Sequence, residues 1–127
     1  MRRQTSGMSS IQNFTDTVKQ LGETLHRRLT SVMMDKAWLR AILDVRYSRD
    51  GSSWLSKIRV FVPNGESISV GMTDEVDLIL ITINTMRSTA FQDTWYGLKL
   101  ELTPDQECSV RLNYDPAWAE DASFVED

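Results

Sequence analysis

The feature that most constrains this chain is a pair of alternating segments between residues 95 and 114, joined by a short polar connection. Apolar side chains occupy every second position of both segments, which is the period of strands with one buried face. They are Tyr96, Leu98, Leu100 and Leu102 in the first segment and Cys108, Val110, Leu112 and Tyr114 in the second. Pairing Leu102 with Cys108 gathers all of them on one side, whereas a slip of one residue would set leucines against Ser109 and Arg111. The sequence therefore predicts a β-hairpin in one register, with Trp95 on its opposite face.

A second hairpin is predicted upstream, around the turn dipeptide Asp50-Gly51. If these are the two loop residues, Tyr47 faces Trp54, and Leu43 faces Ile58. The same register sets Asp44 opposite Lys57 on the other side. The run 63–65 (Pro-Asn-Gly) is a further turn, followed by a short strand over 67–70, so these strands are expected to form a three-stranded meander.

Two helices flank the meander in the predicted order of elements. Ser9 and Gln12 have the spacing of a capping box, which predicts a helix from Ser9 and a flexible leader over residues 1–8. The stripe of that helix comprises Ile11, Phe14, Val18, Leu21, Leu25, Leu29 and Val32. Thr73, followed by acidic residues, predicts the cap of a second helix. The β-branched run 78–83 also fits a buried strand, and the cap favours the helix.

These elements predict an α+β fold with both helices on one face of the sheet, in the order helix, meander, helix, hairpin and short acidic tail. A chain of 127 residues is the size of one domain, here 9–127. No apolar run is long enough to span a bilayer, and the N-terminal residues are polar, so we expect a cytoplasmic protein without membrane contact. The single cysteine, Cys108, is expected on a core face, which suits a reducing compartment.

The formal net charge of −4 hides an asymmetry between the two halves. Residues 1–49 contain nine basic and four acidic side chains, whereas residues 50–127 contain five basic and fourteen acidic ones. An acidic half attracts basic partners and repels nucleic acid. Solubility alone is the alternative explanation of such charge.

No signature of catalysis or of cofactor binding occurs in the sequence. It contains no glycine-rich phosphate loop, no paired-cysteine or histidine metal spacing and no nucleophile elbow, so we expect neither an enzyme nor a metal or cofactor site. His26, the only histidine, has no partner motif. A basic sheet face with aromatic platforms is conceivable from Arg40, Arg46, Lys57, Arg59, Lys99 and Arg111 with Trp38, Phe61 and Trp95. The acidic total disfavours nucleic acid, and a solvated basic rim is the simpler interpretation.

The last residues form an acidic tail that contains two large aromatic side chains. Asp115-Pro116 is a typical helix opening, with the aspartate as cap and the proline at the first helical position. Trp118 and Phe124 either cover the edge of the sheet or anchor an interface in which Glu120 and Asp121 meet basic groups of a partner. Both can hold at once, because a tail fixed by a buried ring presents its carboxylates rigidly.

Residues 95–127 resemble the YezG-like immunity proteins of bacterial polymorphic toxin and contact-dependent growth inhibition systems. The resemblance rests on Trp95, the Leu112-Asn113-Tyr114-Asp115-Pro116 run, Trp118, Glu120-Asp121 and Phe124, and the order of elements fits from Trp38 onward. It implies a small, cytoplasmic, non-enzymatic protein that binds and blocks a cognate toxin domain, often a basic nuclease.

The candidate partner-binding residues are Trp95, Asp115, Trp118, Glu120, Asp121 and Phe124. We expect a monomer or a weak dimer. The alternative function is a small acidic secretion chaperone, which would be an obligate dimer that holds an unfolded segment of an effector.

Overall fold

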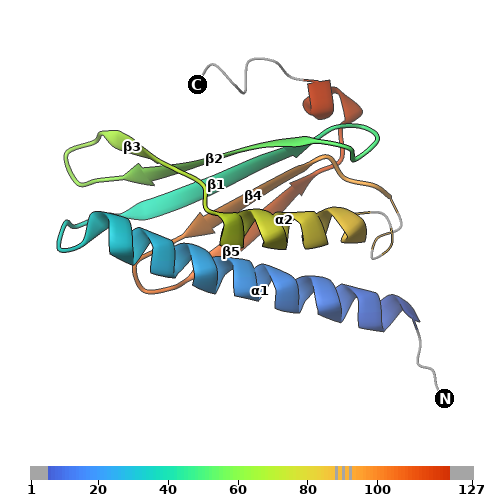
Figure 1. The fold of residues 1–127 in the computed structure, drawn as a ribbon, viewed down its shortest axis with the longest axis horizontal. Helices are drawn as coiled ribbons and strands as arrows, with labels where there is room; N and C mark the ends of the chain where they lie inside the picture. The colour runs from blue at the N-terminus through green and yellow to red at the C-terminus, as the bar shows by residue number, and fades with distance from the viewer. Residues whose placement is uncertain (1–5, 88, 90, 92, 121–127) are drawn as a thin grey trace.

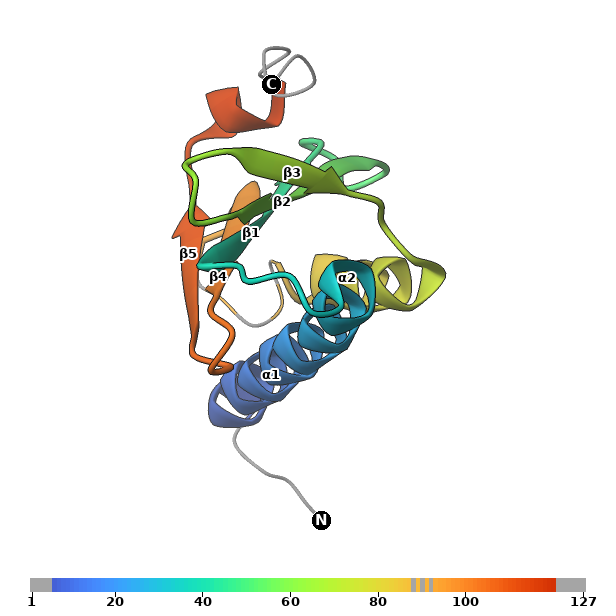
Figure 2. The same ribbon diagram turned by 90° about the vertical axis from the view of Figure 1, so that its left-hand side faces the viewer.

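The structure is a computed structural model that describes residues 6–120 except 88, 90 and 92, without the side chains of 6–10, 118 and 120. The helices are α1 (Ser6–Met33), α2 (Asp74–Met86) and the 3-10 helix η1 (Pro116–Glu120). The strands are β1 (Arg40–Tyr47), β2 (Trp54–Phe61), β3 (Ser67–Val70), β4 (Gly97–Leu102) and β5 (Cys108–Asn113). They form one antiparallel sheet in the order β3-β2-β1-β4-β5. The α+β fold is therefore confirmed, and both long helices lie on one face of the sheet, with η1 on the other side (Figures 1 and 2).

Both predicted hairpin registers are confirmed. Tyr47 pairs with Trp54 and Leu43 with Ile58 in the first hairpin, and Leu102 pairs with Cys108 in the second. The first turn is wider than the predicted two-residue loop, because the Ser48 amide donates to the Ser53 carbonyl at 2.9 Å. The loop grows by one residue on each side of Asp50 and Gly51, so the register of the strands does not change.

Asp50 explains the wider turn. Its Oδ1 accepts hydrogen bonds from the Ser48 hydroxyl at 2.9 Å and from the Ser52 amide and hydroxyl at 2.9 and 2.7 Å. These bonds to the ionised carboxylate lower the pKa of Asp50 to about 2. Gly51 follows with a φ of 75°, a conformation that glycine adopts without strain.

The first helix begins at Ser6, three residues before the predicted start, so residues 6–8 are helical and the expected leader over 1–8 is wrong for them. Ser9 therefore lies inside the helix and not at its N-cap, where the capping box was predicted, and the Gln12 side chain donates forward to Asp16 at 2.9 Å. Leu21, Leu25 and Leu29 of the predicted stripe are fully buried, whereas Ile11 at its N-terminal end is exposed. The central part of α1 therefore covers the sheet, and its first turns extend beyond it.

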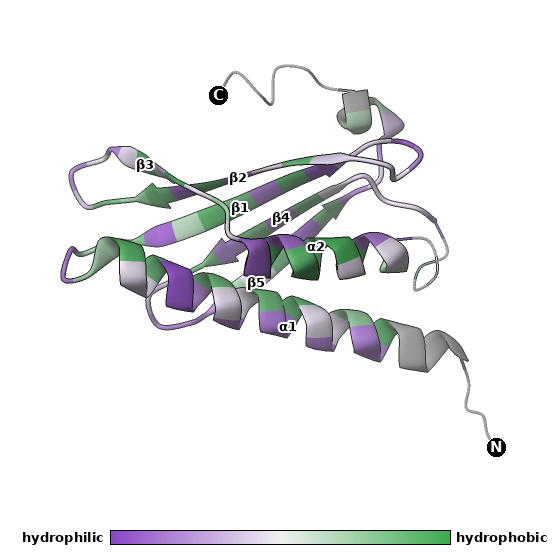
Figure 3. Ribbon diagram, viewed as in Figure 1, coloured by the Kyte–Doolittle hydropathy of each residue, from purple (hydrophilic) through white to green (hydrophobic). Residues whose placement is uncertain are grey.

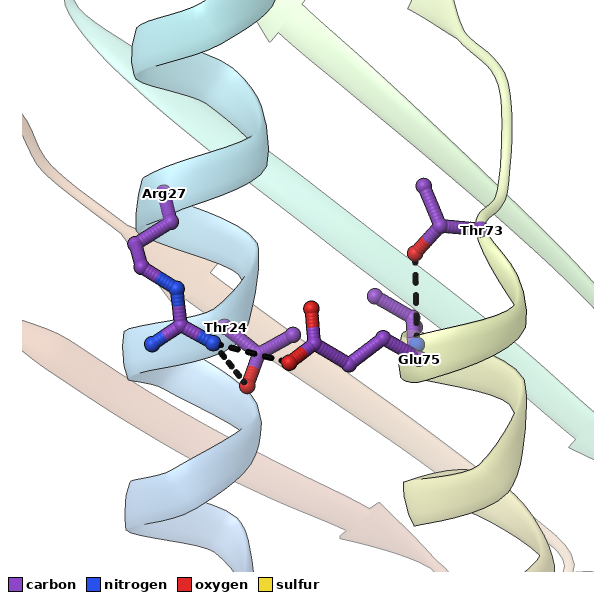
Figure 4. A network of polar contacts seen from close by, with 5 residues as sticks. Thr24, Arg27, Thr73 and Glu75 are labelled. Carbon is purple, nitrogen blue, oxygen red and sulfur yellow. Dashed lines mark hydrogen bonds and ion pairs between the residues drawn. The ribbon is translucent and has the colours of Figure 1, made fainter.

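The second helix is confirmed, and with it the choice of helix over strand for residues 78–83. The Thr73 hydroxyl accepts a hydrogen bond from the Val76 amide at 3.3 Å. One face of α2 is buried through Val76, Ile79, Leu80 and Ile83. Arg27 of α1 donates both to Thr24 and to Glu75 in the first turn of α2, so the two helices are joined at their solvent side (Figure 4). This ion pair is exposed on both sides and therefore contributes little to stability.

Along the strands, hydrophobic and hydrophilic residues alternate, so that the sheet has one apolar and one polar face (Figure 3). One side chain, that of Trp95, departs from the face predicted for it. Trp95 is fully buried, because strand β4 begins only at Gly97 and its alternation does not extend back to the tryptophan. The Trp95 ring lies 5.8–6.1 Å from the rings of Phe14, Tyr47 and Phe91, centroid to centroid.

Cys108 is exposed, contrary to the expectation of a core position. It lies on the predicted side of the sheet, but β5 is an edge strand, and the helices cover that edge incompletely. Gly22 of α1 lies close to it, since a Cβ added at Gly22 would lie 3.3 Å from the Cys108 sulfur. Partial burial still raises the pKa of the Cys108 thiol.

Candidate partner-binding face

The side of the sheet away from α1 and α2 is called the open face. It consists of the strand residues that alternate with the buried ones, and no long helix among the described residues covers it. Its charged members are the cations Arg40, Arg46, Lys57, Arg59, Lys99 and Arg111 and the carboxylates Asp44 and Glu101. The outward placement of the six cations agrees with the sequence. An acidic protein thus has one strongly basic surface.

The open face is hollowed over its central strands. A hollow of about 420 Å³ is lined by Ile42, Asp44, Lys57, Arg59, Phe61, Ser67 and Lys99. A smaller one of about 200 Å³ also borders Asp44 and Lys99 and continues toward β5. The larger hollow has the volume of a small-molecule or side-chain pocket, with the apolar groups Ile42 and Phe61 among cations.

Asp44 lies at the centre of this surface. It faces Lys57 on β2, as predicted, and also Lys99 on β4. Its Oδ1 lies 3.7 Å from Nε of Arg46. Partial burial raises the pKa of Asp44, and the neighbouring Arg46, Lys99 and Lys57 oppose this rise without cancelling it. The second lysine could not be found from the sequence, because its place depends on β4 inserting beside β1.

The aromatic platforms considered for nucleic acid do not gather on the open face. Phe61 lies there, with the Arg40 guanidinium 4.6 Å from its ring centroid. Trp38 instead lies near His26 of α1, with 6.3 Å between ring centroids, and Trp95 is in the core. His26 Nε2 lies 3.1 Å from the Pro104 carbonyl oxygen, so the only histidine of the chain contacts the backbone of the β4–β5 turn.

The predicted opening of the tail is confirmed at Asp115. The Asp115 side chain accepts a hydrogen bond from the Ala117 amide at 3.0 Å, and the Asp115 amide donates to Asn113 Oδ1 at 2.9 Å. The 3-10 helix η1 follows and contacts β1 on the side of the open face (Figure 2). The start of the acidic tail therefore lies against the side of the sheet that faces away from α1 and α2.

Of the six candidate partner-binding residues, the structure describes the side chains of Asp115 and Trp95. Asp115 is exposed at the start of η1, next to the open face. Trp118 and Glu120 belong to η1 by their backbone, and their side chains are outside the description, as are Asp121 and Phe124 entirely. Trp95 is buried, so the expectation of an exposed anchor beside the tail is wrong.

Within the described part of the chain, no group of three or more His, Cys, Asp or Glu side chains is arranged to hold a metal ion. No helix described here has both the length and the apolar character needed to cross a bilayer. In the comparisons with known proteins, no protein-family model matches the chain, and neither does any curated protein.

Proposed function

We propose that this protein is an immunity protein, which binds a cognate bacterial toxin domain and blocks it by stoichiometric occlusion. The observation that supports this best is the joint position of the open face and the start of the acidic tail. One face of the sheet is occupied by the helices, while the other is uncovered by them and leads into a segment rich in carboxylates.

The charge of the tail suits a nuclease as the partner. Residues 115–127 contain five acidic side chains and no basic one. A nuclease domain binds phosphates through lysines and arginines, and carboxylates held in front of such a cleft mimic the substrate charge. Long-range attraction between the two proteins also raises the rate of association.

The structure of the tail's first turn supports tight binding as well. Asp115 caps η1, and η1 contacts β1, so the chain leaves the sheet in a defined direction. A segment that is already ordered loses less conformational entropy when it meets a partner. The resemblance of residues 95–127 to immunity proteins points to the same function.

The test is to mix the protein with the toxin domain encoded next to it and to measure binding by calorimetry. We expect a one-to-one complex and loss of toxin activity in proportion to occupancy. Reversing Glu120 and Asp121 to lysine should weaken binding at least about tenfold, or about 1.4 kcal/mol.

The matched control reverses Asp105 and Glu107, two exposed acidic residues of the β4–β5 turn. It changes the net charge equally and should leave the affinity within about threefold at physiological salt. Absence of any complex with the toxin domain would end the proposal. A stable dimer that binds an unfolded effector segment and ignores the folded toxin would favour the chaperone instead.

A further inference from the structure

We infer that two copies of this protein associate edge to edge through strand β5, in antiparallel orientation and with Val110 on the two-fold axis. The two five-stranded sheets then form one continuous sheet. The inference does not rest on the proposed function, because it concerns an edge of the sheet and not the open face.

The two edges of the sheet differ in how well they are protected against such pairing. Edge strands are normally short, or contain charges, prolines or bulges that prevent another strand from adding. Strand β3, at one edge, has only four residues. Strand β5, at the other edge, has six residues without a proline, and Arg111 is its one charged residue. Among the described residues, no strand pairs with the outer side of β5, so this edge can accept a further strand.

The backbone of β5 presents a regular set of hydrogen-bonding groups to the outside. The Thr103 amide donates to the Glu107 carbonyl at 3.0 Å, so these two residues form a hydrogen-bonded pair of the ladder. Because such pairs alternate along an antiparallel ladder, Ser109 and Arg111 also direct their amides and carbonyls toward β4. A strand that adds at the edge therefore meets the outward-directed groups of Cys108, Val110 and Leu112.

The side chains of these three residues extend the apolar side of the sheet beyond the core. They lie on the helix side, as do their partners in β4, which are all buried. Cys108 and Val110 are exposed, and Leu112 is half-buried. A hollow of about 400 Å³ between α1 and β5 is lined by Phe14, Thr15, Val18, Lys19, Cys108 and Val110 (Figure 2). A neighbouring strand with the same apolar pattern would cover this surface.

A second copy of β5 supplies that pattern. With the axis at Val110, the two Val110 residues lie opposite each other, and Cys108 lies opposite Leu112 of the second copy. All three outward-directed residues then form hydrogen-bonded pairs, with about two bonds in each pair. Because paired side chains share one face, the apolar side chains of the second copy lie on the helix side, next to the hollow.

The charges of β5 are compatible with this register. Ser109 lies opposite Arg111 of the second copy, and Glu107 opposite Asn113, so no two like charges meet. An axis at Arg111 would instead set two arginines opposite each other. An axis at Ser109 would pair Glu107 with Arg111, but exposed ion pairs contribute little, and one outward-directed residue would lose its strand partner.

The size and symmetry of the interface determine the kind of dimer. One pair of short strands makes a small interface, so we expect a Kd between about 10 µM and about 1 mM. The two-fold axis closes the assembly at two copies. The sheet grows within its own plane, so the open face of each copy stays uncovered and each copy can still bind one partner.

The first experiment is sedimentation of the full-length protein at concentrations from about 1 µM to about 1 mM, which bracket the expected Kd. We expect the mass to rise from that of a monomer toward that of a dimer. Val110→Lys places two like charges on the axis and should raise the Kd at least about tenfold. The matched control is Ile68→Lys on β3, since Ile68 is 39% exposed and Val110 is 37% exposed. It should leave the Kd within about twofold.

The second experiment tests the register by disulfide formation and does not require the Val110→Lys variant. In a Cys108→Ser background, Val110→Cys should form a disulfide between two copies, because hydrogen-bonded pairs have Cα atoms about 5.5 Å apart. Ser109→Cys in the same background should not, since the two substituted positions are diagonal neighbours about 7–8 Å apart. Ser69→Cys, exposed on β3, should not either.

Three results would each overturn the inference. They are a wild-type protein that is still monomeric at about 1 mM, a dimer that a folded Val110→Lys variant leaves intact, and disulfide formation through position 109 or 69 rather than 110. A circular dichroism spectrum like that of the wild type shows that a variant is folded. None of these results depends on whether a toxin is bound.

Discussion

The two faces of one sheet differ in how far folding determines them. On the covered side of β1, Ala41, Leu43, Val45 and Tyr47 are all fully buried. The residues between them, Arg40, Ile42, Asp44 and Arg46, form the centre of the open face. The covered side must match the helices in shape and volume, whereas the open side has to satisfy only its own charges. The side that folding leaves unconstrained is where a partner-binding surface can develop.

A buried charged residue on the covered side makes the contrast clear. Arg87 is 4% exposed at the C-terminal end of α2. Its Nε donates to the Trp95 carbonyl at 2.8 Å, one terminal nitrogen donates to Asn84 Oδ1 at 2.9 Å, and its guanidinium lies 4.9 Å from the Tyr47 ring centroid. Burial lowers the pKa of Arg87. Arg87 thus joins α2, the first hairpin turn and the segment that leads into β4.

The strongest test of this difference compares two neighbouring residues of β1. Leu43→Ala removes a fully buried side chain from the centre of the covered side and should cost about 3 kcal/mol, the range of core leucines. Ile42→Ala, one position along, should cost about 1 kcal/mol, because this side chain is only half-buried in the hollow. Urea unfolding measures both. Equal losses would mean that the open face also contributes to the core.

The contrast between the faces also explains what can be predicted from the sequence. Both hairpins and the Thr73 cap depend on residues close together in the chain, and the sequence predicts each with its register or its first residue. The insertion of β4 beside β1 depends on long-range packing, so the second lysine next to Asp44 is not predictable from local patterns. The prediction for Trp95 is wrong because it extends a strand alternation past the strand's first residue.

Only those features of the candidate site that depend on residues close together in the sequence can be predicted. The cap at Asp115 follows from the Asp-Pro dipeptide and is confirmed. The basic positions of the open face follow from strand alternation, but the hollow among them requires the strand order. Cys108 shows the same limit, since no local pattern reveals that its strand lies at an edge.

A smaller difference in stability is expected between substitutions of two arginines, Arg87 on the covered side and Arg40 on the open face. Arg87→Met should cost about 2 kcal/mol, because it leaves the buried Trp95 carbonyl and the Asn84 side chain without their donor. Arg40→Met should cost less than about 0.5 kcal/mol, since its ion pair with Glu101 is half-exposed and methionine keeps the contact with Phe61. Thermal or urea unfolding of the two variants decides. If Arg40→Met lowered the free energy of unfolding more than Arg87→Met, the open face and not the covered side would contain the arginine that stabilises the fold.

The smallest effect is expected at Asp44, and it depends on pH. Partial burial raises the pKa of Asp44 above that of an unfolded aspartate, so the folded state favours the protonated form. The stabilisation that protonation provides is fully present below the unfolded pKa, near about 3.9, and is lost as the pH rises through the folded value. Asp44→Asn mimics the neutral form at every pH.

The variant should therefore be slightly more stable than the wild type at pH 7, by well under about 1 kcal/mol, because Asp44 is only partly buried and Arg46, Lys99 and Lys57 oppose the cost of burying its charge. The difference should shrink toward zero as the pH falls to about 3.5, below the unfolded pKa. Urea unfolding of both proteins at several pH values measures it. If the Asp44→Asn substitution were instead destabilising at pH 7, the lysines would outweigh burial, and the centre of the open face would be held together by its own ion pairs rather than remaining adaptable to a partner.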